Sequence, residues 1–252
     1  MKVALYGKDF SLLEELLKKR GVEVLPMDSP ELDLVIAYGG DGAMLGAELL
    51  RPGLLKCPIR DQETAPLCPK HSLERLLDML LEGRLEKSFL PKLSGSFSGH
   101  TGYAVNDIFL HNKNNTSALR YEVMIDGEIY AKEVVGDGVG VSTVHGSTAY
   151  YRSITHGTFR VGMGVAFSNS TELMNHLVLR EDSIVKVRIL RGAGELVFDN
   201  IKAPFSLKEG ETVTIKMSKE KAAFLGLDLF MCRDCRRIRR EERLTGYENI
   251  PF

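Results

Sequence analysis

The feature that most constrains the fold is a short apolar run that ends abruptly in glycines. Residues 34–38 read Leu-Val-Ile-Ala-Tyr, and Gly39-Gly40-Asp41-Gly42 follow directly, before a stretch typical of a helix. Such a run predicts a buried parallel strand, and glycines at its end let the backbone turn tightly and approach a ligand closely. Because the N–H groups and the positive dipole end of the next helix would face this turn, the pattern predicts an anion site, with phosphate the usual anion.

Asp41 adds a function that a phosphate site alone does not need. A carboxylate beside phosphates can accept a proton from an attacking hydroxyl or hold a magnesium ion. Gly and Asp are also ordinary turn residues. From these residues alone, a plain strand-to-helix turn is an equally good interpretation.

The composition indicates a soluble globular protein with one large domain or two small ones. The chain has 252 residues, of which 44% are hydrophobic and 27% are charged. A formal net charge of -1 gives no general electrostatic reason to bind nucleic acid or an anionic membrane. No apolar run approaches membrane-spanning length, and residues 1–7 read as a strand rather than a signal peptide. We therefore expect a cytoplasmic protein.

The first third of the chain alternates strand and helix patterns. This alternation predicts a parallel sheet with helices on its faces, and ligands bind at the carboxyl ends of such strands. We expect strands at 2–7, 22–27, 33–38 and 54–59, and helices at 10–20, after Gly42 and at 71–83.

After Gly83 the chain is rich in strand patterns, and long helical patterns are missing until its end. We therefore expect an α/β domain at 1–85, rejoined by 231–252, and a β-rich domain at 86–230. Asp126-Gly127 predicts a hairpin turn. The expected strands are 93–97, 102–110, 121–125, 128–135, 139–144, 183–190, 195–198 and 212–217, with a last strand at 222–230.

Two further stretches combine small and polar residues. Asn106-Asp107 sets an amide beside a carboxylate at a strand end, and residues 137–150 read DGVGVSTVHGSTAY. Such runs allow backbone and hydroxyl groups to hydrogen-bond a polar ligand at close quarters. The structural alternative for the second stretch is a turn followed by a helix with Ser147 or Thr148 as its N-cap.

Together and in this order, the motifs resemble those of the NAD kinase family. GGDGA at 39–43 is similar to the family's GGDGT, ND at 106–107 resembles its NE/D motif, and 137–150 is similar to an acidic-Gly strand followed by TPTGSTAY. Looser similarity extends from Met1 to about Phe230. The first motif also occurs in diacylglycerol, sphingosine and 6-phosphofructo kinases, whereas the GSTAY stretch is more specific.

The resemblance implies an α/β domain followed by an all-β domain, in a homo-oligomer (dimer or tetramer) whose active site lies between domains and is completed by a neighbouring subunit. It implies a phosphotransferase that uses ATP, or polyphosphate in some members, and Mg²⁺ or another divalent cation to phosphorylate the 2′-hydroxyl of the adenosine ribose of NAD.

By matched position, the resemblance also assigns individual residues. Asp41 would be the catalytic carboxylate, with Gly40 and Gly42 at the phosphates. The NAD ribose would be held by Asn106 and Asp107, and Asp137 of a neighbouring subunit would face the nicotinamide end. The residues assigned to the adenine pocket are Thr148, Ala149, Tyr150 and Ser153.

Several positions depart from the family pattern. Ala43 replaces a threonine, Asp199-Asn200 replaces an Asp-Gly pair, and residues 60–69 replace the glycine-rich NxGxLGFL segment that lines the NAD site. Val144-His145 and Thr155-His156 also differ. Two alternatives therefore stay open: a related kinase with another adenosine-containing, lipid or sugar acceptor, and a catalytically silent nucleotide-binding protein on the same fold.

The four cysteines allow two interpretations. Cys232 and Cys235 form a C-x-x-C, which could share a zinc ion with Cys57 and Cys68 if the tail folds back onto residues 57–68. Reduced thiols are the alternative that we favour from sequence. The Arg-rich run at 236–240 is interpreted as a solvated tail or helix, because acidic residues follow it.

Overall fold

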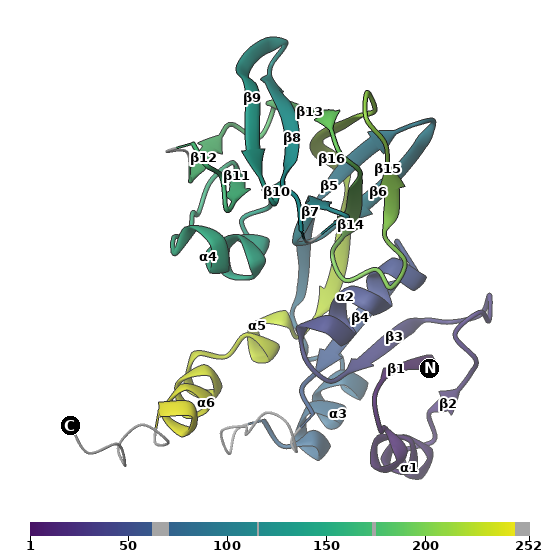
Figure 1. Cartoon of the computed structure of the whole chain (residues 1–252). Coiled ribbons are helices and arrows are strands. Elements are labelled where there is room, and N and C mark those ends of the chain that lie inside the picture. Colours follow the sequence, from purple (N-terminus) through teal and green to yellow (C-terminus); the bar gives the residue numbers. More distant parts are fainter. Residues whose placement is uncertain (62–70, 115, 173–174, 245–252) are drawn as a thin grey trace. The chain divides into compact units, whose positions relative to one another are not determined.

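The computed structural model of the chain describes residues 1–61, 71–114, 116–172 and 175–244 (Figure 1). The chain folds into two compact units, of which the first consists of Met1–Phe89 and Ala222–Phe252 and the second of Leu90–Lys221. The chain therefore passes between the units twice. In the described part of the chain, no helix is both long enough and apolar enough to span a membrane.

The first unit is built on a parallel sheet with the strand order β2-β1-β3-β4-β16. The end of β16 enters this sheet where Phe224 pairs with Lys56. From the sequence, residues 222–230 were assigned to the β-rich domain. This pairing explains why they belong to the first unit instead. The strands are β1 (Lys2–Gly7), β2 (Glu23–Val24), β3 (Leu34–Tyr38), β4 (Leu55–Ile59) and β16 (Thr212–Leu225).

Alternating side chains of β3 bury opposite faces of this sheet, as the period of two along a strand requires. Ile36 joins the core formed with α1 (Ser11–Lys19) and α3 (Leu73–Leu81), whereas Val35 and Ala37 pack in the core that includes Ala47 of α2 (Asp41–Leu50). Residues 34–38 are all buried, which is why this strand reads as one continuous apolar run. The helices α5 (Leu227–Phe230) and α6 (Arg233–Leu244) follow β16.

The second unit contains two sheets around a shared apolar core. One has the order β16-β13-β8-β9, with β5 pairing with both β16 and β6, and the other is antiparallel with the order β12-β11-β10-β7-β14-β15. The strands of the first sheet, besides β16, are β5 (Lys87–Phe97), β6 (His100–Ala104), β8 (Leu119–Ile125), β9 (Glu128–Gly136) and β13 (Ile184–Arg191). Those of the second are β7 (Asp107–Asn112), β10 (Gly138–Ser142), β11 (Met163–Ser168), β12 (His176–Leu179), β14 (Gly194–Phe198) and β15 (Phe205–Leu207).

The structure confirms the predicted fold class of an α/β domain together with a β-rich domain. Two predicted strands are correct only in part. Residues 102–110 form β6 and β7 instead of one strand, because the backbone between them hydrogen-bonds to a side chain from elsewhere, as described below. The strand predicted at 222–230 is the end of β16 only as far as Leu225, because Gly226 has a φ of 68° and the helix α5 follows it.

Candidate functional site

The glycine turn of the first unit has the form that the sequence predicts. β3 ends at Tyr38, Gly39 has a φ of 141°, and Gly40 is the N-cap of α2 with Asp41 as the first helical residue. Gly40, Asp41 and Gly42 are exposed, and a Cβ added to Gly40 would meet no atom within 4 Å. The N-terminal end of α2 is therefore open to a ligand, and helix N-termini favour anions.

Arg60 contacts Asp41 from the end of the neighbouring strand. Tyr38 and Ile59 are paired in register, so the carboxyl ends of β3 and β4 lie side by side. Arg60 Nη2 lies 3.1 Å from Asp41 Oδ1, Nε donates to the Phe230 carbonyl at 3.1 Å, and the guanidinium lies 4.0 Å from the centre of the Phe230 ring. Arg60 is 11% exposed, so ring and carbonyl hold its charge in a fixed place beside the carboxylate.

In the second unit, Asp199 organises the backbone between β6 and β7. Its carboxylate accepts hydrogen bonds from the backbone N–H groups of Val105 at 2.7 Å, Asn106 at 2.7 Å and Asp107 at 3.1 Å. Asp199 directly follows β14, has a φ of 50°, and donates its own N–H to the Asp107 carbonyl at 2.9 Å. These bonds replace strand pairing at 105–106, which explains why the sequence pattern did not predict the break.

The side chains at 106 and 107 are buried polar groups. Burial, and then the neighbouring Asp199 carboxylate, raises the pKa of Asp107 to about 8, so at neutral pH this carboxyl is largely protonated and can donate a hydrogen bond. Asn106 Oδ1 is buried with no hydrogen-bond partner among the described residues, and the same holds for the Ser142 hydroxyl, whose residue pairs with Asp107 in register. Unsatisfied buried groups of this kind are rare and call for an explanation, such as a catalytic role or a bound water or ion.

The stretch at 137–150, which ends in GSTAY, packs directly on residues 105–106. Thr143 donates its N–H to the Asn106 carbonyl at 2.8 Å and its hydroxyl to the Val105 carbonyl at 2.7 Å. Gly146 lies so close that an added Cβ would stand 2.1 Å from the Asn106 carbonyl oxygen. The two motifs of this unit are therefore one constellation, although 30 or more residues separate them in the sequence.

The residues assigned to the adenine pocket lie at the start of α4 (Tyr150–Thr155), after the 3₁₀ turn Gly146–Thr148. Thr148, Ala149 and Tyr150 are exposed, and the N-cap is Ala149 instead of Ser147 or Thr148. The Tyr150 ring lies edge-on to Phe109 at 4.7 Å between centroids, and Tyr150 and Ser153 line an open polar hollow with His156. A large exposed ring over an apolar support suits stacking by a flat base.

Asp137 lies at the start of β10, next to the same hollow. Its carboxylate accepts a hydrogen bond from Asn169 Nδ2 at 2.7 Å, and Asn169 lines the hollow. The Asp137 backbone is fixed on both sides by hydrogen bonds to Asn112 and Ser168. Asp137 is thereby held in place within this unit.

The structure changes the predicted cysteine set. Cys57 is buried in the core of the first unit, where burial raises the pKa of its thiol to about 12, and it is not in the group of ligating side chains found nearby. Cys68 lies outside the described residues. Cys232 and Cys235 are instead grouped with His71, a residue that the sequence interpretation did not select.

Arg60, Asp199 and Ser142 are the other residues that the prediction of the site missed. For Arg60 a signal existed, because it follows a strand that neighbours β3 in a parallel sheet. For Asp199 the sequence marked only a departure from a family motif. Its partners lie 92 to 94 residues away, and nothing local indicates them.

Comparison with known proteins gives a consistent family. Residues 105–227 match the family described as the ATP-NAD kinase C-terminal domain. An NAD kinase of Acidithiobacillus ferrooxidans is 32% identical over 131 residues, which are 48% of this chain and 44% of that protein. A bifunctional NADP phosphatase/NAD kinase of Methanococcus maripaludis is 24% identical over 79% of this chain and 38% of its own length. The chain thus spans less than half the length of these two curated relatives.

Solved structures share the fold over nearly the whole chain. The crystal structure of yeast NADH kinase complexed with NADH gives a TM-score of 0.76 at 18% identity, covering 100% of this chain and 89% of that one. An NAD kinase from Archaeoglobus fulgidus in complex with ATP gives 0.71 at 21% identity, covering 96% and 99%. By sequence over residues 105–227 and by fold over nearly its whole length, this chain is similar to proteins of the NAD kinase family.

Proposed function

We propose that this protein is an ATP-dependent NAD kinase, which transfers the γ-phosphoryl group of ATP to the 2′-hydroxyl of the adenosine ribose of NAD and releases NADP. Support comes from the family match over residues 105–227 and from relatives that carry the name NAD kinase. The related structures solved with NADH and with ATP support the two substrates.

The observation that carries the proposal is the buried polar pair at 106–107. Asn106 and Asp107 are each 8% exposed. Asn106 Oδ1 is an acceptor that has no partner in the described chain, and the protonated Asp107 carboxyl is a donor. A ribose offers two adjacent hydroxyls, each of which donates and accepts, so one donor beside one acceptor matches a ribose edge.

Asp41 has the chemistry for the phosphoryl-transfer step. Its carboxylate stands at the open N-terminal end of α2, where the ATP phosphates would bind, and it can orient the acceptor hydroxyl and take its proton. Magnesium prefers one or two carboxylates together with substrate phosphates. Asp41, 59% exposed, fits that pattern, and a bound ion would neutralise charge on the phosphates. Arg60 holds the Asp41 carboxylate in position.

The remaining features of the proposal rest on the family resemblance. We place the enzyme in the cytoplasm as a homo-oligomer, with Asp137 of one subunit facing the nicotinamide end of an NAD held by another. Thr148, Ala149, Tyr150 and Ser153 would line the adenine site, and polyphosphate is an alternative donor.

A different acceptor is the second candidate, and Arg60 favours it. Arg60 begins the segment that replaces the family's glycine-rich acceptor loop, and it brings a nearly buried cation to Asp41. A cation there suits an acceptor with an anionic group near its hydroxyl. Phosphorylation of such an acceptor in preference to NAD, in a panel of dinucleotides and nucleosides, would support this candidate.

Calorimetric titration with NAD, NADP, ATP and AMP tests the ribose site. Replacing Asp107 with Ala removes the donor of the pair, which should cost about 1–3 kcal/mol of binding, or up to about a hundredfold in affinity. Asp182→Ala, at a side chain that is 75% exposed, is the matched control and should leave binding unchanged. Absence of binding by all four ligands at millimolar concentration would refute the proposal.

A further inference from the structure

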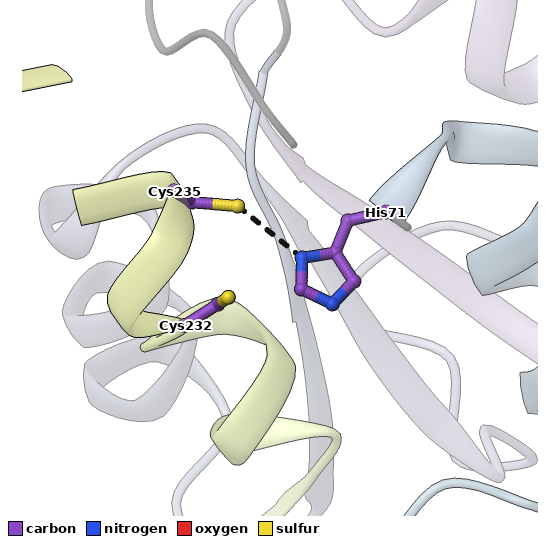
Figure 2. A group of neighbouring side chains, drawn as sticks. All are labelled: His71, Cys232 and Cys235. Carbon is purple, nitrogen blue, oxygen red and sulfur yellow. Dashed lines mark hydrogen bonds between the residues drawn. The ribbon is translucent and has the colours of Figure 1, made fainter. Parts of the chain in front are cut away.

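Three side chains with metal-ligating atoms gather in the first unit, as Figure 2 shows. They are His71, Cys232 and Cys235, and their ring nitrogens and sulfur atoms all lie within 4.8 Å of one another. His71 Nδ1 is 3.2 Å from Cys235 Sγ. The kinase chemistry proposed above uses none of these side chains.

The chain brings these residues together through the starts of two helices. His71 directly precedes Ser72, the N-cap of α3, and the Ser72 hydroxyl accepts a hydrogen bond from the Arg75 N–H. Cys232 directly precedes α6, and its backbone carbonyl accepts a hydrogen bond from the Arg236 N–H at 3.0 Å. The C-x-x-C spacing thus covers one helical turn, which puts both thiols on the same side of α6.

The cluster is shielded from solvent. His71 is 6% exposed and Cys235 is 1% exposed, while Cys232 is half-buried. A buried imidazole and two sulfur atoms concentrate three ligand atoms where water is largely excluded. Zinc prefers this combination of nitrogen and sulfur ligands.

We propose that His71, Cys232 and Cys235 bind a zinc ion. Zn–S bonds of about 2.3 Å and Zn–N bonds of about 2.0 Å at tetrahedral angles imply N···S separations of about 3.5 Å and S···S separations of about 3.8 Å. The 3.2 Å contact and the 4.8 Å limit of the cluster are within a few tenths of an ångström to one ångström of these values. Cys68 lies outside the described residues and is not part of the proposal.

A simple thiol–imidazole hydrogen bond is the competing explanation. It accounts for His71 and Cys235, whereas the grouping of ligating atoms also includes the Cys232 sulfur. A metal accounts for all three side chains. A bound metal would also link the start of α6 to the start of α3. The start of α6 is close in sequence to Phe230, the residue whose ring packs on Arg60.

The test is the metal content of the purified full chain, with and without single substitutions. Mass spectrometry of the elements should find about one zinc per chain in the wild type and less than about 0.2 in Cys232→Ser, Cys235→Ser and His71→Ala. Cys57→Ala, a buried cysteine outside the cluster, is the matched control and should keep its zinc.

Cobalt substitution keeps the test decisive if the variants do not fold. Wild-type protein that has been stripped of metal and titrated with Co²⁺ should develop thiolate-to-cobalt charge-transfer and tetrahedral visible bands that saturate at about one equivalent. Protein without zinc that also gives no such bands would overturn the proposal, as would folded Cys232→Ser and Cys235→Ser variants that keep their zinc. Because neither readout depends on kinase activity, the zinc proposal is tested separately from the proposed kinase function.

Discussion

The raised pKa of Asp107 predicts a specific pH dependence of stability. Burial beside Asp199 raises this pKa from 3.8 to about 8, so the folded chain binds the Asp107 proton more tightly than the unfolded chain does. The contribution to stability is complete below about pH 4 and is lost as the pH rises towards the folded pKa. Over this range the slope approaches one proton, or about 1.4 kcal/mol per pH unit.

Asp107→Asn should remove that slope, because an amide of the same shape stays neutral at every pH. The free energies of unfolding of wild type and Asp107→Asn, measured by urea denaturation at pH 5, 6 and 7, should therefore diverge in favour of the variant. The difference should change by about 2–3 kcal/mol over these two pH units. Other titrating groups are common to both proteins and cancel in the difference. Parallel stability curves would refute the assignment, and Asp182→Asn, an exposed carboxylate, should give such parallel curves as a control.

Two further substitutions test the packing. Lys56→Met should destabilise the chain by about 3–5 kcal/mol in urea denaturation, because it leaves Glu48 buried without its cation; the side chains of Lys56 and Glu48 are 0% and 3% exposed. Lys18→Met removes an exposed ion pair and should cost less than about 1 kcal/mol. Equal costs for the two substitutions would contradict the burial argument. Gly146→Ala sets a Cβ against the Asn106 carbonyl, which should lower the free energy of unfolding by about 1–3 kcal/mol and weaken NAD binding. Denaturation and calorimetry measure these two effects. An unchanged NAD affinity would mean that residues 105–107 and the GSTAY stretch do not share a site.

The elements of the α/β unit could be predicted because their burial is visible in the local pattern of apolar residues. β3 is buried on both faces and reads as one apolar run, and the buried leucines of α3 recur at helical spacing. The glycine turn after β3 could likewise be predicted from neighbouring residues in the sequence. The short strands β11 and β12 were missed, because β11 is buried along its whole length and shows no alternation, and β12 has only 4 residues.

Features that depend on distant contacts could not be predicted. The break between β6 and β7 results from the Asp199 carboxylate, and the protonation of Asp107 results from burial beside that same group. The grouping of His71 with Cys235 joins residues that are 164 positions apart. The motifs thus indicated where polar chemistry lies within each unit, whereas the charge state of Asp107 and the ligand set at His71 needed the folded chain.

The most direct test of the central claim is the formation of NADP from NAD and ATP in the presence of magnesium. We expect the wild-type protein to accumulate NADP, and Asp41→Asn to do so at least about a hundredfold more slowly while keeping its fold. Asp28→Asn, at an exposed position of the same unit, is the matched control and should retain full activity. Folded wild-type protein that forms no NADP, or an Asp41→Asn variant with wild-type turnover, would contradict the account.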